Sequence, residues 1–356
     1  MGPVLPTSSH DSYIDSDSHS DCNVHQPAGC KKKLQALTHY ARSEDQTFLT
    51  LPEWYIVYSA DEFGAFVQSH PPSDFPYFRS ISQFWSLYGQ ILYEAWSTPS
   101  FNWGYHVMIG VIGASFTAEY LFKGLYETTV GAITAWASTA GPWQATTRED
   151  RFIQHVAQDY SAFIHATPWY EYPFSAKLKE FWSLPGEAEG SAMRRWERRF
   201  EFTMELLFKT AWGWAIKQGT GAGYDPEALE IQAWVKQGSK DIAALDPSIR
   251  VLDQLGDRSY LMAIPRYEPF KQAVKTLIDH DVRLIEVAGN EQILITIIAP
   301  HDWQDRHHIG RKVCEWPILT QPDRKRVALF VPIKQLHETL PTLEQAAVQL
   351  DHLYDF

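Results

Sequence analysis

A short stretch of sequence that occurs twice constrains the fold of this chain more than any other feature. Residues 116–123 read FTAEYLFK and residues 202–209 read FTMELLFK, so six of the eight positions are identical. Repetition of a segment at wide spacing is typical of a structural unit that has been copied. The sequence therefore predicts two related helical units.

The similarity extends beyond these two stretches. Residues 60–87 align without gaps with residues 157–184, and nine of the 28 positions are identical, including FWSL at the end of each segment. Unrelated sequences of ordinary composition would share about two. We interpret residues 50–137 and 147–218 as two copies of one helical unit, which differ by an insertion in a surface loop.

The pattern of apolar residues divides residues 1–223 into three segments. Residues 1–46 are rich in Ser, Asp, His and Pro and predict a disordered tail. Helical periodicity then favours a first repeat over residues 47–141 and a second over residues 142–223.

The last part of the chain changes period. Residues 224–248 are expected to form a connector, and residues 249–356 contain short apolar runs that alternate with two helical stretches. This order predicts a ferredoxin-like α+β sandwich. The expected fold class is therefore α+β, with a tandem-duplicated all-α domain and a C-terminal sandwich that forms a separate body.

Composition limits the classes of function. The formal net charge is −12, which argues against a general nucleic-acid binder because phosphate contacts need a basic surface. The three cysteines do not suggest a disulfide framework. The 14 Trp residues are typical of large cores, of interfaces and of the boundary between lipid and water.

The sequence favours a cytoplasmic or peripheral membrane location. Its N-terminus lacks the basic and apolar regions of a secretory signal. Residues 101–118 carry no formal charge, but a membrane span needs about 20 apolar residues. Glu119, Lys123 and Glu127 follow directly in the same expected helix. A transmembrane helix at 101–118 is therefore possible but not favoured.

The first candidate site is a repeated acid–lysine pair. Glu119 and Lys123 in the first copy correspond to Glu205 and Lys209 in the second, and each pair is spaced by one helical turn. If the copies pack about a pseudo-two-fold axis, the four side chains meet at the centre and could perform acid–base chemistry. The alternative is a structural or surface ion pair, which retention in both copies favours.

The second candidate site is a polar loop near the C-terminus. His301, Asp305, His307 and His308 lie within eight residues and are suitable metal ligands. Their spacing matches no known metal motif, so an ordinary polar loop is favoured and no metal is expected.

The third candidate is a group of aromatic residues beside the proline breaks. Trp54, Tyr55 and Tyr58 precede the break in the first copy, and Trp169 and Tyr170 lie at the break in the second. They could line an apolar ligand pocket or lie against a bilayer. Alternatively, they belong to the core.

No standard catalytic or cofactor motif is present. The chain lacks a Gly-rich phosphate loop, a G-x-S-x-G elbow, H-E-x-x-H and C-x-x-C, so no cofactor is expected. We expect a non-enzymatic binding or scaffold protein that engages a hydrophobic ligand, a lipid surface or a protein partner through its helical half. The alternative is an enzyme or small-molecule binder with a pocket between the two repeats.

Overall fold

The chain consists of a helical region followed by two four-stranded antiparallel sheets, so the expected α+β class is confirmed. The computed structural model describes residues 44–96, 101–138, 147–185, 192–220, 230–236, 246–256, 258–345 and 348–354. The expected tail therefore lies outside the described residues, except that residues 44–46 begin the first described helix.

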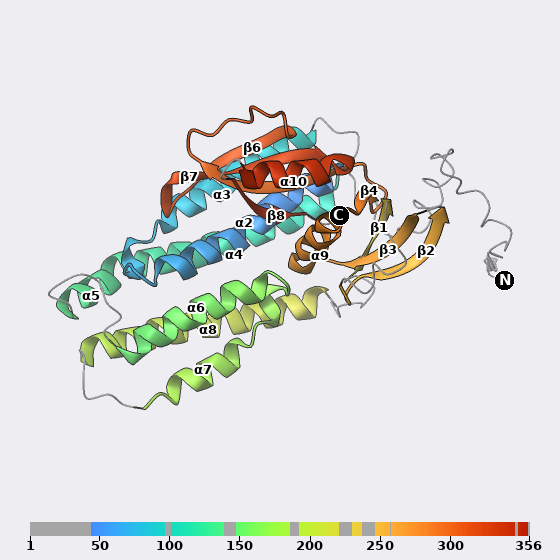
Figure 1. Cartoon of the computed structure of the whole chain (residues 1–356). Helices are drawn as coiled ribbons and strands as arrows, with labels where there is room; N and C mark the ends of the chain where they lie inside the picture. Colours follow the sequence, from blue (N-terminus) through green and yellow to red (C-terminus); the bar gives the residue numbers. More distant parts are fainter. Residues whose placement is uncertain are drawn as a thin grey trace, which may run out of the picture.

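The helical region has two layers, which Figure 1 shows one above the other. The upper layer contains α2 (Glu44–Phe66), α3 (Tyr77–Trp96) and α4 (Trp103–Tyr126), which continues through a π-helical turn, η3 (Glu127–Gly131), into α5 (Ala132–Ser138). The lower layer contains α6 (Arg148–Ile164), α7 (Phe174–Trp182) and α8 (Ala192–Thr220). The 3₁₀ turns η2 (Pro72–Asp74) and η4 (Trp169–Glu171) lie at the proline breaks.

Local sequence sets where these helices begin. Before α6, the Thr147 hydroxyl accepts a hydrogen bond from the Asp150 amide at 3.0 Å, and the Asp150 carboxylate accepts one from the Thr147 amide at 3.3 Å. This capping box satisfies amides that have no partner inside the helix. The Asn102 side chain accepts from the Tyr105 amide at 3.0 Å and caps α4 in the same way.

The two sheets have the same internal order. The first contains β1 (Glu230–Lys236), β2 (Arg250–Gly256), β3 (Ser259–Pro265) and β4 (Arg283–Val287), with α9 (Glu268–Asp279) before the last strand. The second contains β5 (Gln292–Pro300), β6 (Arg311–Ile318), β7 (Gln321–Pro332) and β8 (Gln349–Leu353), with η7 (Ile333–Gln335) and α10 (Leu336–Gln345) before the last strand. The spatial orders are β2-β3-β1-β4 and β6-β7-β5-β8. In both sheets, the strand that comes second along the chain lies at one edge, followed by the third, the first and the fourth.

The expected ferredoxin-like sandwich is therefore wrong. That fold has a single sheet, whereas here the strands form two sheets with one helix inserted in each. The error arose at β1, which lies inside the range expected as a connector and pairs with both β3 and β4. A short apolar run in a central strand has no diagnostic period, so its sequence alone did not identify it.

The second sheet is buried on both faces. Along β5, Ile293, Ile295 and Ile297 point into a core shared with the first sheet, α9 and α10. Leu294 points the other way, into a core formed with α2, α3 and α4. The expectation that the C-terminal part forms a separate body is therefore wrong, because the helical region and this sheet share one apolar core.

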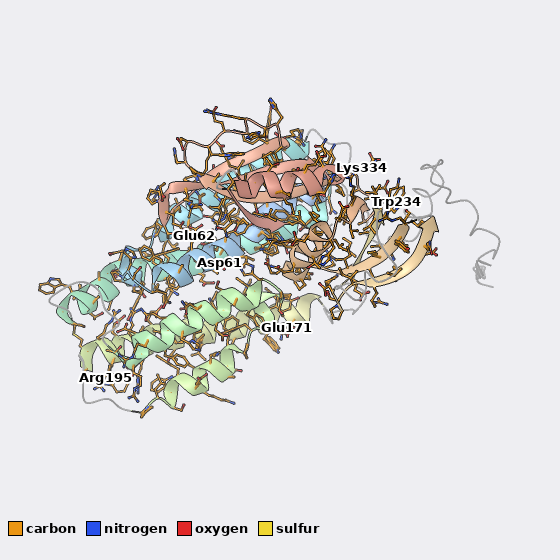
Figure 2. The ribbon with its side chains drawn as sticks, in the orientation of Figure 1. Asp61, Glu62, Glu171, Arg195, Trp234 and Lys334 are labelled. Carbon is orange, nitrogen blue, oxygen red and sulfur yellow. The ribbon has the colours of Figure 1, made fainter. Side chains whose placement is uncertain are left out.

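Polar contacts also fix α2 on the second sheet. The Tyr58 hydroxyl lies 2.7 Å from the Thr296 hydroxyl and 2.9 Å from the Tyr354 hydroxyl. Glu62, labelled with its neighbour Asp61 in Figure 2, forms an ion pair with Arg326 of β7. These contacts hold the helical region in one position relative to the sheets.

Candidate functional site

Helices α4 and α8 run antiparallel and are joined by ion pairs along their length. Three pairs link α4 and its π-helical turn to α8: Glu119 with Lys209 at 2.9 Å, Lys123 with Glu205 at 2.9 Å, and Glu127 with Arg198 at 2.7 Å. The residue numbers rise along one helix as they fall along the other. We call this set of three pairs the ionic seam.

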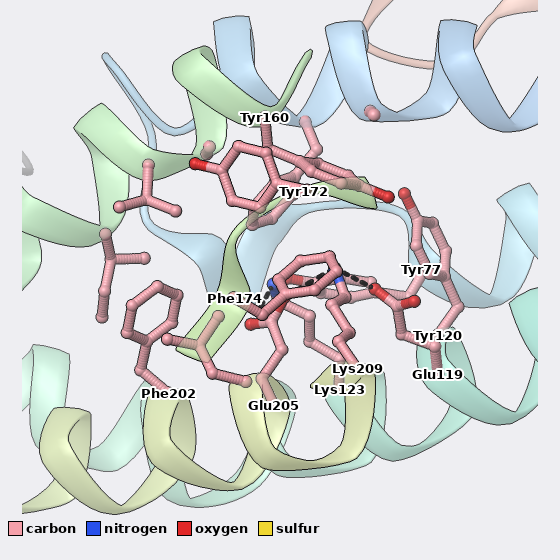
Figure 3. A pocket seen from close by; sticks show the side chains of 16 residues that line it. Tyr77, Glu119, Tyr120, Lys123, Tyr160, Tyr172, Phe174, Phe202, Glu205 and Lys209 are labelled. Carbon is pink, nitrogen blue, oxygen red and sulfur yellow. Dashed lines mark hydrogen bonds and ion pairs between the residues drawn. The ribbon is translucent and has the colours of Figure 1, made fainter. Parts of the chain in front are cut away.

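The four residues singled out from the repeated acid–lysine pair meet in this seam. Glu205 lies between two ammonium groups, because Lys209 Nζ also approaches it at 3.0 Å. Figure 3 shows Glu119, Lys123, Glu205 and Lys209 pointing from two neighbouring helices into one cavity. Each lysine pairs with the glutamate of the other helix.

Residues at matching positions of the two helical segments make matching contacts. Lys123 Nζ lies 4.2 Å from the ring centre of Phe63, and Lys209 Nζ lies 4.6 Å from that of Tyr160. The indole N–H of Trp85 donates to Thr117 at 2.9 Å, and that of Trp182 donates to Thr203 at 3.0 Å. The rings of Phe84 and Phe116 lie 5.6 Å apart, and those of Phe181 and Phe202 lie 5.0 Å apart.

We call Glu119, Lys123, Glu205 and Lys209 the quartet. Their electrostatic surroundings favour permanent charges. Burial opposes ionisation of Glu205, but Lys123 and Lys209 outweigh it and lower the pKa of Glu205 to about 2. Burial also opposes the charge on Lys209, but Glu119 and Glu205 raise its pKa well above the usual value. A general acid or base needs a pKa near the working pH. Glu205 and Lys209 are thus suited to a structural or electrostatic role and poorly suited to proton transfer.

A second charged cluster, which sequence reasoning missed, extends the seam. Arg194 and Arg198 are 0% and 1% exposed. Arg194 pairs with Asp150 at 3.0 Å and with Glu197 at 3.0 Å, and it also donates to the backbone carbonyl of Gly131 at 3.1 Å. The available signal was the placement of acids and arginines three residues apart on α8, which puts opposite charges on one helix face.

The π-helical turn η3 lies where this cluster meets α4. A side chain at Gly131 would collide with the Glu127 carboxylate and lie 3.1 Å from the Arg198 guanidinium. A side chain at this position would therefore require the Glu127 carboxylate, which is paired with Arg198, to move. Such π-turns inside α-helices are often found at functional sites.

Two hollows adjoin the quartet. The inner cavity is lined by residues of α2, α3, α4, α6, α7 and α8, which include Phe63, Tyr77, Lys123 and Glu205. The outer groove lies between α4 and α8 and is lined mainly by apolar residues; they include Val111, Phe116, Trp169, Phe208 and Trp212. Glu119, Tyr160 and Lys209 line both hollows, which therefore adjoin at these three side chains.

The outer surface of the same two helices is apolar. Every exposed residue between 103 and 137, and every exposed residue between 192 and 216, is uncharged. The large ones are Trp103, Val107, Met108, Val111, Leu121, Phe122, Leu125, Val130, Ile133, Trp136, Met193, Trp196, Phe200, Met204, Leu207, Phe208, Trp212 and Trp214. We call this surface the apolar face. Among the described residues, no helix combines the length and the apolar character needed to cross a membrane.

The aromatic candidates are divided between the core and the groove. Trp54 is buried and stacks on His352 at 3.5 Å, Tyr55 donates to the Ser80 carbonyl at 3.1 Å, and Tyr58 contacts the second sheet. Trp169 lines the outer groove, and Tyr170 packs beside Gly213 of α8.

The polar loop does not assemble a metal site in the described structure. His301, His307 and His308 are exposed, and the Asp305 carboxylate accepts the amide hydrogen of Ile309 at 3.1 Å. No group of three His, Cys, Asp or Glu side chains in the described part of the chain is placed to hold a metal ion. The loop carboxylate therefore stabilises a turn.

Comparison with known proteins adds no identity. No protein-family model matches the chain, and neither curated proteins nor solved structures gave a significant match.

Proposed function

We propose that this protein binds a lipid surface through the apolar face of α4, α5 and α8. One observation carries the proposal: between residues 103 and 137 and between residues 192 and 216, the charged side chains are buried or half-buried and every exposed residue is uncharged. A helix on the surface of a water-soluble protein has the opposite arrangement, with charged residues outside. Helix α6 follows that ordinary rule, because its exposed residues include Arg151, His155 and Gln158.

The size of the apolar face supports a binding role. Phe122, Leu207 and Phe208 are each about half exposed, at 52%, 49% and 48%, and they belong to a continuous set along two adjacent helices. Apolar surface in contact with water costs roughly 25 cal/mol per Å². Extended apolar patches on protein surfaces usually mark contact with lipid or with another protein.

The distribution of tryptophan favours lipid over a protein partner. Trp103 and Trp136 lie towards the two ends of the α4–α5 face, and Trp196 and Trp214 lie towards the ends of the α8 face. Smaller aliphatic residues, Met and Phe occupy the stretch between them. Trp is enriched at the boundary between lipid and water, whereas protein interfaces place their aromatic anchors near the centre.

Co-sedimentation with vesicles of neutral phosphatidylcholine tests the proposal. We expect the protein to sediment with the vesicles at both low and high salt, because apolar burial is not screened by salt. The double variant Phe122→Glu and Leu207→Glu should abolish sedimentation. The matched control, His155→Glu and Gln158→Glu on the polar surface of α6, should leave it unchanged.

Two results would overturn the lipid proposal. One is the absence of co-sedimentation at low salt. The other is a lipid-free dimer that the Phe122→Glu and Leu207→Glu variant converts to monomers, because the apolar face would then be occupied by a second copy of the chain.

We also propose that residues 50–137 and 147–218 are copies of one ancestral unit. The paired aromatic, cation–π and indole contacts described above support this, since they join residues at equivalent positions of the aligned sequences. An experimental structure in which the two segments fail to superimpose would end this proposal.

A further inference from the structure

We propose that the outer groove and the inner cavity together bind a single uncharged lipid that carries a carbonyl oxygen. The lipid tail lies in the outer groove, and its oxygen reaches the Tyr77 hydroxyl in the inner cavity. The inference rests on the proposed function in one respect, namely that the ligand enters from the lipid against which the groove opens.

The outer groove provides an apolar route from the apolar face towards the interior. Val111, Phe208 and Trp212 belong both to the apolar face and to the lining of the groove. Tyr160 and the ion pair of Glu119 with Lys209 line the groove and the cavity alike. A tail in the groove thus places its polar end beside this pair.

The charges at the inner end favour an uncharged polar group. The quartet contains two carboxylates and two ammonium groups in mutual contact. Its formal charges cancel, so the quartet has no excess charge with which to hold an anion or a cation. An ionic headgroup would lose its hydration without gaining a counter-charge, which is costly in a buried site.

The Tyr77 hydroxyl supplies the specific contact. Tyr77 is 1% exposed, and its hydroxyl has no hydrogen-bond partner among the described residues. Burial raises the pKa of Tyr77 well above its usual value, so the hydroxyl keeps its proton and acts as a donor. Buried polar groups in proteins are nearly always hydrogen-bonded. An acceptor oxygen from a ligand would satisfy this one.

Two probes with similar chains test the proposal by thermal shift and titration: methyl decanoate, which is uncharged, and decanoate, which is anionic. We expect the ester to raise the melting temperature of the full-length protein in a saturable way and to bind more tightly than the acid. Tyr77→Phe should weaken ester binding roughly five- to tenfold, the effect of one lost hydrogen bond.

The stability of the ligand-free variant separates a binding role from a structural one. Tyr77→Phe removes an unpaired buried hydroxyl and should raise the melting temperature. Tyr55→Phe is the matched control, because its hydroxyl has acceptors within hydrogen-bond distance, the Ser80 carbonyl at 3.1 Å and the Gln83 side-chain oxygen at 2.9 Å. That variant should lower the melting temperature and leave ester affinity unchanged.

Three outcomes would each overturn the inference: equal binding of ester and acid, unchanged ester affinity in Tyr77→Phe, or a lower melting temperature of that variant without ligand. Vesicle sedimentation is measured separately and should not respond to Tyr77→Phe. Ester binding without vesicle binding would reject only the lipid-surface proposal, and the reverse result would reject only the internal site.

Discussion

Arg194 and Arg198 place guanidinium groups at buried helix positions, which are normally apolar. Each is compensated by carboxylates from a neighbouring segment, Asp150 for the first and Glu127 for the second. A buried ion pair contributes little net stability, but removing one partner leaves an uncompensated charge and is strongly destabilising. These residues therefore fix how α8 aligns with α6 and with the π-helical turn that follows α4.

Glu201 is the member of this cluster with the clearest dependence on pH. Burial raises its pKa from 4.5 to about 8, although Arg198, whose nearest nitrogen is 3.8 Å away, opposes the shift. The folded protein thus holds a proton that the unfolded chain releases at lower pH. The contribution of this group to stability is full below pH 4.5 and is lost as the pH rises towards about 8.

Glu201→Gln should make stability less dependent on pH. Glutamine preserves the uncharged state, so the difference in unfolding free energy between the variant and the natural protein should grow in favour of the variant from pH 5 to pH 8, by up to about 1 kcal/mol per pH unit. Urea unfolding at several pH values measures it. A constant difference across this range would contradict the prediction.

At the residue scale, the sequence predicted the quartet but not its surroundings. Glu119 and Lys209 were found because the FTxExLFK stretch repeats. The buried arginines align with Met108 and Ile112, so the repeated stretch could not reveal them. Periodicity identifies the two faces of a helix, but which face is inside depends on neighbouring elements. The sequence alone therefore does not show that the charged residues of α8 face inward and its apolar residues outward.

At the element scale, α3 and α4 are held together by the fit of a phenylalanine against a glycine. A side chain at Gly113 would collide with the ring of Phe84, which is fully buried. Gly110 lies one turn earlier on α4, and a Cβ placed there meets nothing within 4 Å. The two glycines are thus a matched pair with opposite expected effects.

Gly113→Ala should destabilise the protein by about 1–3 kcal/mol, because overpacking forces the two helices apart. Gly110→Ala should be neutral or stabilise it by up to about 1 kcal/mol, because alanine favours the helix and has space. Thermal unfolding of both variants checks this. Equal effects would mean that the contact of α3 with α4 is looser than described.

The sequence predicted most helices and missed two strands. Proline breaks and the capping residues of α6 are local signals, so the helix ends near Pro71 and Thr147 could be found. The strands β1 and β2 lack such signals, and their pairing depends on β3. The ferredoxin-like prediction failed because the partners of a strand are decided by contacts distant in sequence.

At the scale of the whole molecule, the second sheet joins the helical region to the first sheet. Arg326 of β7 lies at this junction and pairs with Glu62 of α2 and with Asp351 of β8. Its guanidinium group also lies 4.3 Å from the ring centre of Tyr58. One side chain thus connects three elements from opposite ends of the chain.

Arg326→Met should destabilise both parts of the molecule together. The variant leaves Glu62 and Asp351 without their counter-charge and should cost about 3–5 kcal/mol. Hydrogen exchange should then increase in peptides of α2 and of the second sheet alike. Lys312→Met is the control, because its pair with Glu315 is largely exposed and should contribute about 1 kcal/mol or less. Faster exchange confined to one part would show that the two unfold independently.

The ionic seam has a consequence for how the chain is made. Its two sides are separated in sequence by more than 70 residues, from Glu127 to Arg198. Ribosomes extend a chain at roughly 5–20 residues per second, so α4 waits several seconds or longer for the arginines and lysines that neutralise it. During that interval the nascent chain carries Glu119 and Glu127 without their counter-charges, on a helical segment whose outer face is apolar. An early-binding chaperone would protect the chain most at this stage.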